Sequence, residues 1–220
     1  MTDGTILIDK PADMTSFGVV ARVRRLLSEQ QGKKVKVGHT GTLDPFATGL
    51  MIIVVGKECK NAQHYSKLDK VYEATIRLGQ SSTTGDPEGE ITDNEGKIPT
   101  RKEVEATLAT FIGEITQQPP IYSAIKVDGE RAYKLARAGK PVEIPRRQIT
   151  IYSLDLIDYA YPELKIKTHV SSGTYIRTLA QDIGSVLGTA AYCTQLRRTA
   201  IGEWKIAGAQ TLQEFGVLNP

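Results

Sequence analysis

Residues 38–49 read GHTGTLDPFATG, and the apolar run LMIIVV follows directly at residues 50–55. A bilayer crossing takes about 20 apolar residues, so this short run predicts a buried strand. Glycines and a proline interrupt the preceding segment, which predicts a loop. The loop holds one imidazole, His39, and one carboxylate, Asp44, and is the first candidate site. The alternative is that Asp44 only begins a turn with the proline that follows it.

The patterns around this loop predict further strands and helices. Upstream, residues 4–9 favour a strand, and Thr15 or Ser16 can cap a helix with apolar residues at helical spacing. Downstream, residues 71–79 alternate, which predicts a half-buried strand with Tyr72 on its apolar side. Next we expect a loop with a hairpin at 80–98, a helix capped by Thr100 and Glu103 and running through Ile112, and a basic helix at 131–138. Paired strands are expected at 148–159 and 163–170, followed by a helix from Thr174 that Gly188 ends. The last expected elements are short strands at 192–197 and 203–207 and a helical turn near Thr211. The chain is therefore expected to be a strand-rich α and β protein.

The composition is that of an ordinary globular protein. The chain has 220 residues, 40% hydrophobic and 24% charged, which allows one large domain or two small ones with a substantial core. Cys59 and Cys193 are far apart and we expect no secretory leader, so no disulfide framework is expected. These features favour a reducing cytoplasm, and no apolar run predicts a membrane span.

Charge is unevenly distributed along the chain. Residues 22–36 contain six basic side chains against the single acid Glu29, whereas residues 86–95 contain five acidic side chains. A polyanion can bind such a basic segment selectively. The alternative is a solvated helix end beside a basic loop.

The sequence lacks the usual signatures of metal, hydrolase and nucleotide sites. The histidines His39, His64 and His169 show no paired ligand spacing, and neither cysteine has a neighbouring partner, so zinc would lack ligands. No serine has the G-x-S-x-G context of a nucleophile elbow. No G-x-x-x-x-G-K-[ST] or G-x-G-x-x-G pattern occurs, so we expect neither a metal nor a nucleotide cofactor.

The segment 37–49 closely resembles the catalytic motif of TruB-type tRNA pseudouridine synthases, and this motif is long and specific. Further blocks match in the same order over nearly the whole chain. They are Asp9-Lys10-Pro11, Thr15-Ser16, Asp69-Lys70-Val71-Tyr72, Pro120-Ile121-Tyr122-Ser123-Ala124-Ile125-Lys126, Gly173-Thr174-Tyr175-Ile176-Arg177 and Leu196-Arg197-Arg198. One departure is Asp13, where family members commonly have glycine. Aspartate tolerates left-handed backbone better than most residues, so we expect the turn to survive.

The resemblance implies an α+β pseudouridine synthase fold, with a mixed, largely antiparallel sheet flanked by helices. Residues 1–220 would form one catalytic domain, with a basic, thumb-like, RNA-gripping insertion around 119–147. No separate C-terminal RNA-binding domain is expected, and tRNA affinity is then expected to be weaker than in longer relatives.

The resemblance also implies an isomerase that converts uridine to pseudouridine in tRNA, usually uridine 55 of the T arm. The enzyme would flip the target nucleotide out of its stack, and Asp44 would begin cleavage of the C1′–N1 bond, as a nucleophile or as a base, before C5 joins C1′. By the same resemblance, Arg177 pairs with Asp44 and favours its charged form. No cofactor or external reactant is needed. The expected partner is tRNA, without DNA or a membrane, and the expected enzyme is a cytoplasmic monomer.

The other expected substrate-binding residues also come from the resemblance. Tyr72 is the stacking platform for the flipped uracil and helps to remove the C5 proton. Tyr175 and Leu196 line the uridine pocket, and His39 holds the displaced RNA structure. For His39, Tyr175 and Leu196, ordinary loop or core packing is the alternative.

Basic side chains on several segments are candidates for phosphate contacts, which would make RNA binding salt-sensitive. The candidates are Arg22, Arg24, Arg25, Lys33, Lys34, Lys36, Arg131, Lys134, Arg137, Arg146, Arg147, Arg197 and Arg198. The alternative functions are a folding helper that binds tRNA without modifying it and a subunit of an RNA-guided pseudouridine synthase. Asp44 distinguishes enzyme from helper, because only the enzyme needs its carboxylate.

Overall fold

A computed structural model describes residues 3–94, 96–123, 125–127, 129–132, 135, 138 and 144–217. The chain forms two compact units, Met1–Tyr72 with Arg197–Pro220 and Glu73–Leu196. Helices accompany the strands of one mixed, largely antiparallel sheet, which confirms the α+β fold predicted from the sequence.

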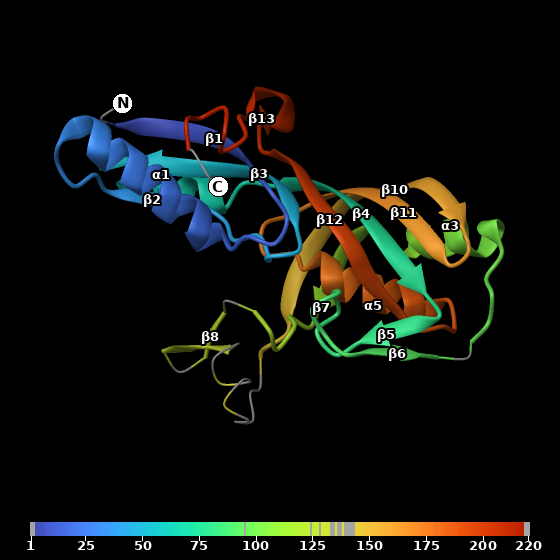
Figure 1. The fold of residues 1–220 in the computed structure, drawn as a ribbon. Helices are drawn as coiled ribbons and strands as arrows, with labels where there is room; N and C mark the ends of the chain where they lie inside the picture. Colours follow the sequence, from blue (N-terminus) through green and yellow to red (C-terminus); the bar gives the residue numbers. More distant parts are fainter. Residues whose placement is uncertain are drawn as a thin grey trace. The chain divides into compact units, whose positions relative to one another are not determined.

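The sheet of the first unit is built around β3, Thr48–Val55, the strand predicted from the apolar run. All its residues except the first are buried. β1, Gly4–Lys10, pairs with β3 antiparallel along its length, and β2, Val37–His39, pairs antiparallel with the last residues of β3. The end of β12, Ala191–Ile201, runs parallel to the first residues of β3 (Figure 1). β3 is thus hydrogen-bonded on both edges, which suits an uninterrupted apolar run.

Helix α1, Ser16–Gln31, begins where the sequence predicts. Thr15 is the N-cap, and its hydroxyl accepts a hydrogen bond from the Gly18 N–H. The predicted apolar face is buried, including Val19 and Val23. Gly32 closes the helix in the left-handed conformation with φ 63°, as a glycine C-cap does.

The rest of the first unit covers the other side of β3. Leu50, Ile52 and Val54 form a buried cluster with Ile201 of β12. The short elements of this unit are η1, Gly56–Asn61, α2, Ala62–Ser66, β13, Trp204–Lys205, and η2, Ile206–Gly208.

The second unit carries the longer antiparallel hairpin. β10, Arg147–Ala160, pairs with β11, Glu163–Val170, and on its other edge with β7, Gly113–Gln117. The strand order is β12-β4-β11-β10-β7, in which β4 is Lys70–Leu78. Tyr72 on β4 is 8% exposed, as the alternation of this strand predicts.

Two helices and two small hairpins complete the described part of the second unit. α3, Arg101–Thr110, has the predicted capping box of Thr100 and Glu103. α5, Ile176–Val186, buries its predicted apolar face and ends before Gly188, whose φ is 74°. The hairpins are β5, Gln80–Ser82, with β6, Ile91–Asp93, and β8, Lys126–Val127, with β9, Glu130–Arg131.

Several predicted boundaries were wrong. Residues 38–39 are strand and not loop, because they pair with β3 as part of β2. Residues 48–49 are also strand, because they belong to β3 and pair with β12. Thr174 does not begin α5, because its hydroxyl donates to the Ser171 carbonyl while Tyr175 is the N-cap. Instead of two short strands, β12 is one long strand followed by a two-residue β13. α3 ends at Thr110 and not at Ile112. The single helical turn predicted near Thr211 is present, because the Phe215 N–H donates to the Thr211 carbonyl at 3.0 Å.

Much of the expected insertion at 119–147 lies outside the described residues. This includes most of the predicted basic helix at 131–138, with Lys134 and Arg137. In the part of the chain that the structure describes, no helix is both long and apolar enough to span a membrane.

The backbone at Asp13 agrees with the prediction from its side chain. Asp13 has φ 60° and is the one non-glycine residue with positive φ in the described ranges. Aspartate therefore adopts the left-handed turn at this position.

Candidate functional site

Asp44 lies in the turn that leads into β3. The carbonyl of Asp44 accepts a hydrogen bond from the Ala47 N–H at 3.1 Å, so the Asp-Pro pair does begin a turn. The Asp44 residue is half-buried, whereas Leu43 beside it is 4% exposed and anchors the loop in the core.

Two buried side chains hold the residues on either side of Asp44. The Ser16 hydroxyl donates to the Leu43 carbonyl at 2.9 Å and accepts from the Leu43 N–H at 2.8 Å. The Lys10 ammonium donates to the Pro45 carbonyl at 3.0 Å and to the carbonyls of two residues in the turn after β1. Lys10 is fully buried, so these hydrogen bonds offset the cost of placing its charge there. The first turn of α1 and the end of β1 therefore fix the backbone around Asp44.

Arg198 holds the two ends of the same loop. Its Nε donates to the Leu50 carbonyl at 2.8 Å and its Nη2 to the Gly41 carbonyl at 3.2 Å. Gly49 has φ 109°, and a Cβ there would lie 2.3 Å from the Arg198 carbonyl oxygen. Only glycine lets β3 and β12 approach this closely.

One of the two candidate phosphate contacts on β12, Arg198, was misassigned. Arg198 is 1% exposed and binds the protein backbone, so its guanidinium is not available to RNA. The Arg197 guanidinium makes two hydrogen bonds to the Asp9 carboxylate, at 3.1 and 2.6 Å. Arg198 therefore supports the loop. The Arg197 side chain is 41% exposed, so its prediction as a phosphate contact stays untested.

A buried lysine, Lys70, lies close in sequence to Tyr72, the predicted stacking residue. Lys70, at the start of β4 and two residues before Tyr72, donates to the Ser66 carbonyl at 2.6 Å and to the Leu68 carbonyl. Burial lowers the pKa of Lys70 to about 8, and the charge of Arg198 acts in the same direction while Asp69 opposes it.

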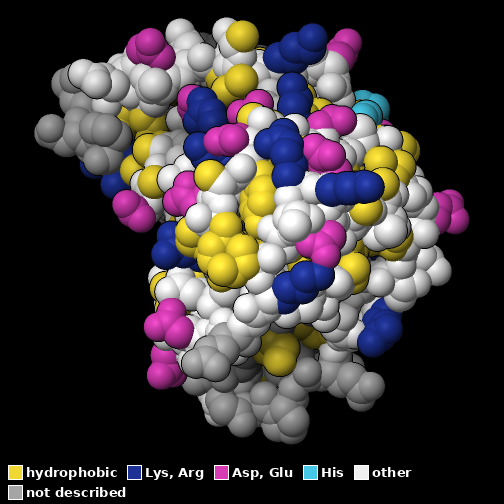
Figure 2. Space-filling view, turned by 90° about the vertical axis from the view of Figure 1, so that its right-hand side faces the viewer, with side chains coloured by type: hydrophobic (Ala, Val, Ile, Leu, Met, Phe, Trp, Pro, Cys, Tyr) yellow, Lys and Arg dark blue, Asp and Glu magenta, His cyan; other side chains and the backbone are white. Residues whose placement is uncertain are grey.

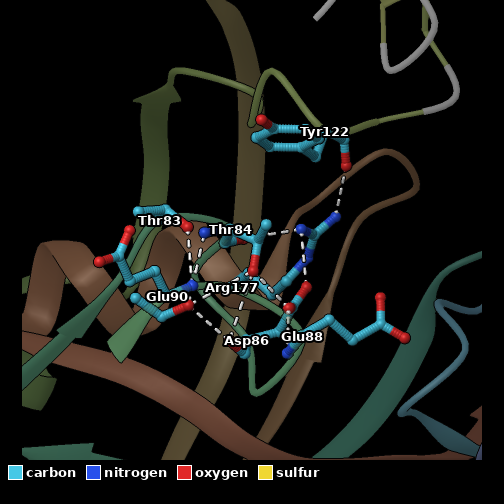
Figure 3. A network of polar contacts seen from close by, with 8 residues as sticks. Thr83, Thr84, Asp86, Glu88, Glu90, Tyr122 and Arg177 are labelled. Atoms are coloured by element: carbon cyan, nitrogen blue, oxygen red, sulfur yellow. Dashed lines mark hydrogen bonds and ion pairs between the residues drawn. The ribbon is translucent and has the colours of Figure 1, made fainter. Parts of the chain in front are cut away.

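In the second unit, Arg177 is the centre of a buried polar network (Figure 3). Its Nη1 lies 3.0 Å from Asp86 Oδ2 and also donates to the Thr84 carbonyl at 2.8 Å. Its Nη2 donates to the Tyr122 carbonyl at 2.8 Å. The other oxygen of Asp86 accepts from the Thr84 hydroxyl at 2.5 Å and from the Glu88 N–H at 3.0 Å. The guanidinium, at the start of α5, is thus held by a carboxylate and two carbonyls.

Tyr175, two residues before Arg177, is held by a different side chain. The Gln117 amide donates to the Tyr175 carbonyl at 3.0 Å and accepts from its N–H at 2.8 Å. Gln117 is fully buried at the end of β7. The Arg147 guanidinium lies over the Tyr175 ring at 5.3 Å, within cation–π range, and donates to the Gly173 carbonyl.

The predicted site residues divide between the two units. Asp44, His39 and Tyr72 belong to the first, and Tyr175, Arg177 and Leu196 belong to the second. Tyr72, on β4, is the last residue of the first unit before the chain enters the second. Leu196, on β12, is the last residue of the second unit before the chain returns to the first. Leu196 is 8% exposed, and His39 lies on β2 opposite Ile53. A pair between Asp44 and Arg177 stays a prediction.

Residue patterns alone did not identify the supporting side chains. Asp86 reads as one member of an acidic run, and Gln117 and Ser16 as ordinary polar residues. Each acts on a residue distant in sequence, by 91, 58 and 27 positions respectively. The only signal was that Ser16 belongs to a block that matches the family motif.

A metal site does not arise from this arrangement. Within the described ranges of the chain, no three His, Cys, Asp or Glu side chains are grouped to hold a metal ion. The chemistry available is that of a carboxylate on a rigid turn and of a fixed guanidinium.

Two family models match the chain. The TruB family pseudouridylate synthase N-terminal domain matches residues 24–176, and the tRNA pseudouridylate synthase B C-terminal domain matches residues 177–218. These boundaries differ from those of the two compact units.

Curated relatives carry the same name. The chain is 45% identical over 215 residues to tRNA pseudouridine synthase B of Cupriavidus pinatubonensis, and 46% identical over 212 residues to that of Burkholderia lata. The alignments cover 96% of this chain and 67% and 64% of the two relatives. The chain thus spans about two thirds of the length of these relatives.

Solved structures have the same architecture. A chain of the archaeal box H/ACA sRNP Nop10-Cbf5 complex matches with a TM-score of 0.69 and 26% identity, over 96% of this chain and 51% of that one. Family models, curated relatives and fold therefore agree, and the chain belongs to the TruB family of pseudouridylate synthases.

Proposed function

We propose that this chain isomerises uridine to pseudouridine in tRNA, at uridine 55 of the T arm, with Asp44 as the catalytic carboxylate. The observation that carries the proposal is the rigid placement of Asp44. Ser16 and Lys10 hold the residues on either side of it, and Arg198 holds the loop ends. A backbone fixed in this way presents a carboxylate without reorganisation during the reaction. The names of the curated relatives support tRNA as the substrate.

The reaction needs an ionised carboxylate in its first step. The carboxylate of Asp44 either attacks C1′ of the ribose or removes a ribose proton, and in both cases the C1′–N1 bond breaks with its electron pair leaving on uracil. The uracil turns and C5 bonds to C1′; this displaces the Asp44 carboxylate in the first route, and in the second route Asp44 returns the proton to the ribose. C5 then loses its proton to a base, and N1 takes up a proton. The product is an isomer of the substrate, so no co-reactant is consumed.

The other predicted residues are assigned to handling the flipped nucleotide. Tyr72 supplies the stacking surface and helps to remove the C5 proton, Tyr175 and Leu196 line the uridine pocket, and His39 holds the displaced RNA structure. The fixed orientation of Tyr175 by Gln117 and Arg147 supports its role.

Arg177 is proposed to act on Asp44 as a permanent positive charge. Asp86 balances the buried guanidinium, and the Thr84 and Tyr122 carbonyls set its plane. An arginine held so firmly can favour the carboxylate over the neutral acid at Asp44 without moving.

The experiment is incubation of the protein with unmodified tRNA transcript, followed by mapping of pseudouridine at single-nucleotide resolution. We expect one pseudouridine, at position 55, and none in a transcript that carries cytidine at that position. Modification elsewhere would overturn the assigned target, and no modification would overturn the activity. Activity in the absence of any guide RNA separates this function from that of an RNA-guided subunit. The higher identity to the tRNA enzymes than to the H/ACA chain favours the unguided activity.

A further inference from the structure

The first unit has a basic pocket at the end of β3 remote from the Asp44 turn. Its volume is about 280 Å³, and its lining residues are Arg24, Lys34, Val35, Lys36 and Val37. Three of these five carry permanent positive charge at neutral pH. The pocket has no role in the function proposed for Asp44.

The backbone of this region directs the lysines outward. Val35 is 5% exposed, and its N–H donates to the Ser28 hydroxyl on α1 at 3.1 Å. Lys34 and Lys36, on either side of Val35, are both exposed, so their side chains point away from the core that holds Val35. The Lys36 carbonyl accepts from the Gly56 N–H at 2.8 Å, which ties the segment to the end of β3.

Arg24 is oriented toward the same pocket from α1. Its guanidinium lies 5.7 Å from the centre of the Phe17 ring, which is seven residues or about two turns earlier in α1. Phe17 is 64% exposed. The aromatic face restricts the arginine without neutralising it. The cavity is therefore bordered by one cation that packs on an aromatic ring and by two lysines on the segment just before β2.

The three cations of the pocket are not held by carboxylates in the described part of the chain. Arg24, Lys34 and Lys36 form no ion pair there, whereas the neighbouring Arg25 pairs with Glu29.

Other surfaces of the chain are built differently. On the β10–β11 hairpin, Asp155 lies opposite Lys167 and Asp158 lies opposite Lys165. Figure 2 shows a face on which Lys and Arg side chains are set among Asp and Glu side chains. Three cations without an ion pair around one concavity repel one another, and an anion in the cavity relieves that repulsion.

The pocket and the Asp44 turn lie at opposite ends of β3. Val37 pairs with Val55, the last residue of β3, whereas Asp44 comes before its first residue. Seven steps at about 3.3 Å per residue give β3 a length of about 23 Å. A ligand group in the pocket is thus on the order of 20 Å from the target nucleotide, or about six steps of a duplex at roughly 3.4 Å per step.

We propose that this pocket binds a backbone phosphate of the tRNA, remote from the uridine that Asp44 acts on. The proposal rests on the proposed function for its choice of RNA. A contact of this kind strengthens binding of the whole tRNA equally before and during the reaction, so it leaves the chemical step unchanged.

The test compares the variant Lys34→Ala/Lys36→Ala with a charge-matched control, Lys60→Ala/Lys102→Ala. The control lysines are exposed and lie outside the pocket. Kd is measured over a range of salt concentrations for full tRNA and for a short hairpin that carries the target uridine on a stem of about four base pairs, too short to reach six steps.

For the pocket variant and full tRNA we expect Kd to rise about three- to tenfold at moderate salt, and the slope of log Kd against log salt to fall by about 0.7–0.9 for the lost phosphate. The hairpin should bind the variant and the wild type equally, and the control should match the wild type on both RNAs. Equal weakening by the control, no weakening by the pocket variant, or the same weakening on the hairpin would each overturn the proposal.

Two further measurements distinguish a tRNA contact from a free-anion site and from an effect on the chemical step. Backbone amide shifts of Val35 and Val37 during titration with inorganic phosphate test for a free-anion site. Such shifts, combined with unchanged tRNA affinity of the pocket variant, would assign the pocket to a free anion and overturn the RNA contact. The single-turnover rate at saturating tRNA should be the same for variant and wild type. If wild type itself makes no pseudouridine, the proposed activity fails, whatever the binding results.

Discussion

Arg177 Nη1 lies 3.0 Å from Asp86 Oδ2, and both side chains are 3% exposed. Two opposite charges out of water stabilise the fold only while each keeps its partner. The acidic run of the sequence is thus not uniformly a solvated face, because Asp86 belongs to the core of the second unit.

Replacing Asp86 with alanine is expected to destabilise the protein by about 3–5 kcal/mol, because it leaves a buried guanidinium without its counter-charge. Urea denaturation of the isolated chain measures this. The control is Glu29→Ala, which removes the exposed partner of Arg25 at 3.6 Å and should cost less than about 0.5 kcal/mol. Equal losses for the two variants would mean that the Arg177–Asp86 pair contributes nothing specific.

Ser16→Ala removes both hydrogen bonds to the Leu43 backbone, next to Asp44. We expect a loss of about 1–3 kcal/mol in stability and a fall in kcat of up to about 100-fold through misplacement of the carboxylate, with little change in KM. Thr15→Ala is the matched control, because it removes the α1 N-cap at a cost of about 1 kcal/mol without touching the loop. Steady-state kinetics should show an unchanged kcat for Thr15→Ala and recovery in Ser16→Thr. A similar fall in both alanine variants would assign the effect to general stability.

Gly49→Ala tests the close approach of β3 and β12. The added Cβ would meet the Arg198 carbonyl at 2.3 Å in a backbone with φ 109°, and we expect a loss of about 2–6 kcal/mol from the clash and the strain together. Gly38→Ala places a Cβ no nearer than 3.7 Å from Val54 and should change stability by less than about 1 kcal/mol. Thermal denaturation of both variants checks the difference, which should be absent if the two strands can separate freely.

Lys70 should make stability depend on pH in a defined direction. Its pKa is lowered from 10.5 to about 8 in the folded state, so the unfolded chain binds more protons between these values. The free energy of unfolding of the wild type should therefore rise with pH, relative to Lys70→Met, by up to about 3 kcal/mol across this window and stay parallel below it. Urea denaturation of both proteins at pH 7, 8, 9 and 10 measures the difference. A difference that does not change with pH would show that Lys70 is not desolvated.

The sequence predicted the elements whose signals are local. The apolar run predicts β3, Thr15 predicts the start of α1, and the Thr100 capping box predicts α3, because in each case the cause lies within a few neighbouring residues. One boundary error, the length of β12, has a long-range cause. The strand pairing that extends β12 through Arg197 and Arg198 comes from β3, far away in the sequence.

The site was predictable only in part, for the same reason. Asp44 stands out because glycines and a proline frame it, and the family motif assigns its role. The residues next to Asp86 and Gln117 give no such signal. Asp86 contacts Arg177 and Gln117 contacts Tyr175, and both of these partners are far away in the sequence. Arg198 was misassigned because basic residues are usually solvated, whereas β12 turns this one into the core, where backbone carbonyls satisfy it.

The central claim is tested most directly by Asp44→Asn, which keeps the shape of the side chain but cannot ionise. Pseudouridine formation and tRNA affinity are measured on the same preparation, with the exposed Asp158→Asn as the control for loss of one carboxylate. The account predicts that Asp44→Asn binds tRNA like the wild type and forms no pseudouridine, while Asp158→Asn is fully active. Complete modification of tRNA by Asp44→Asn would contradict it.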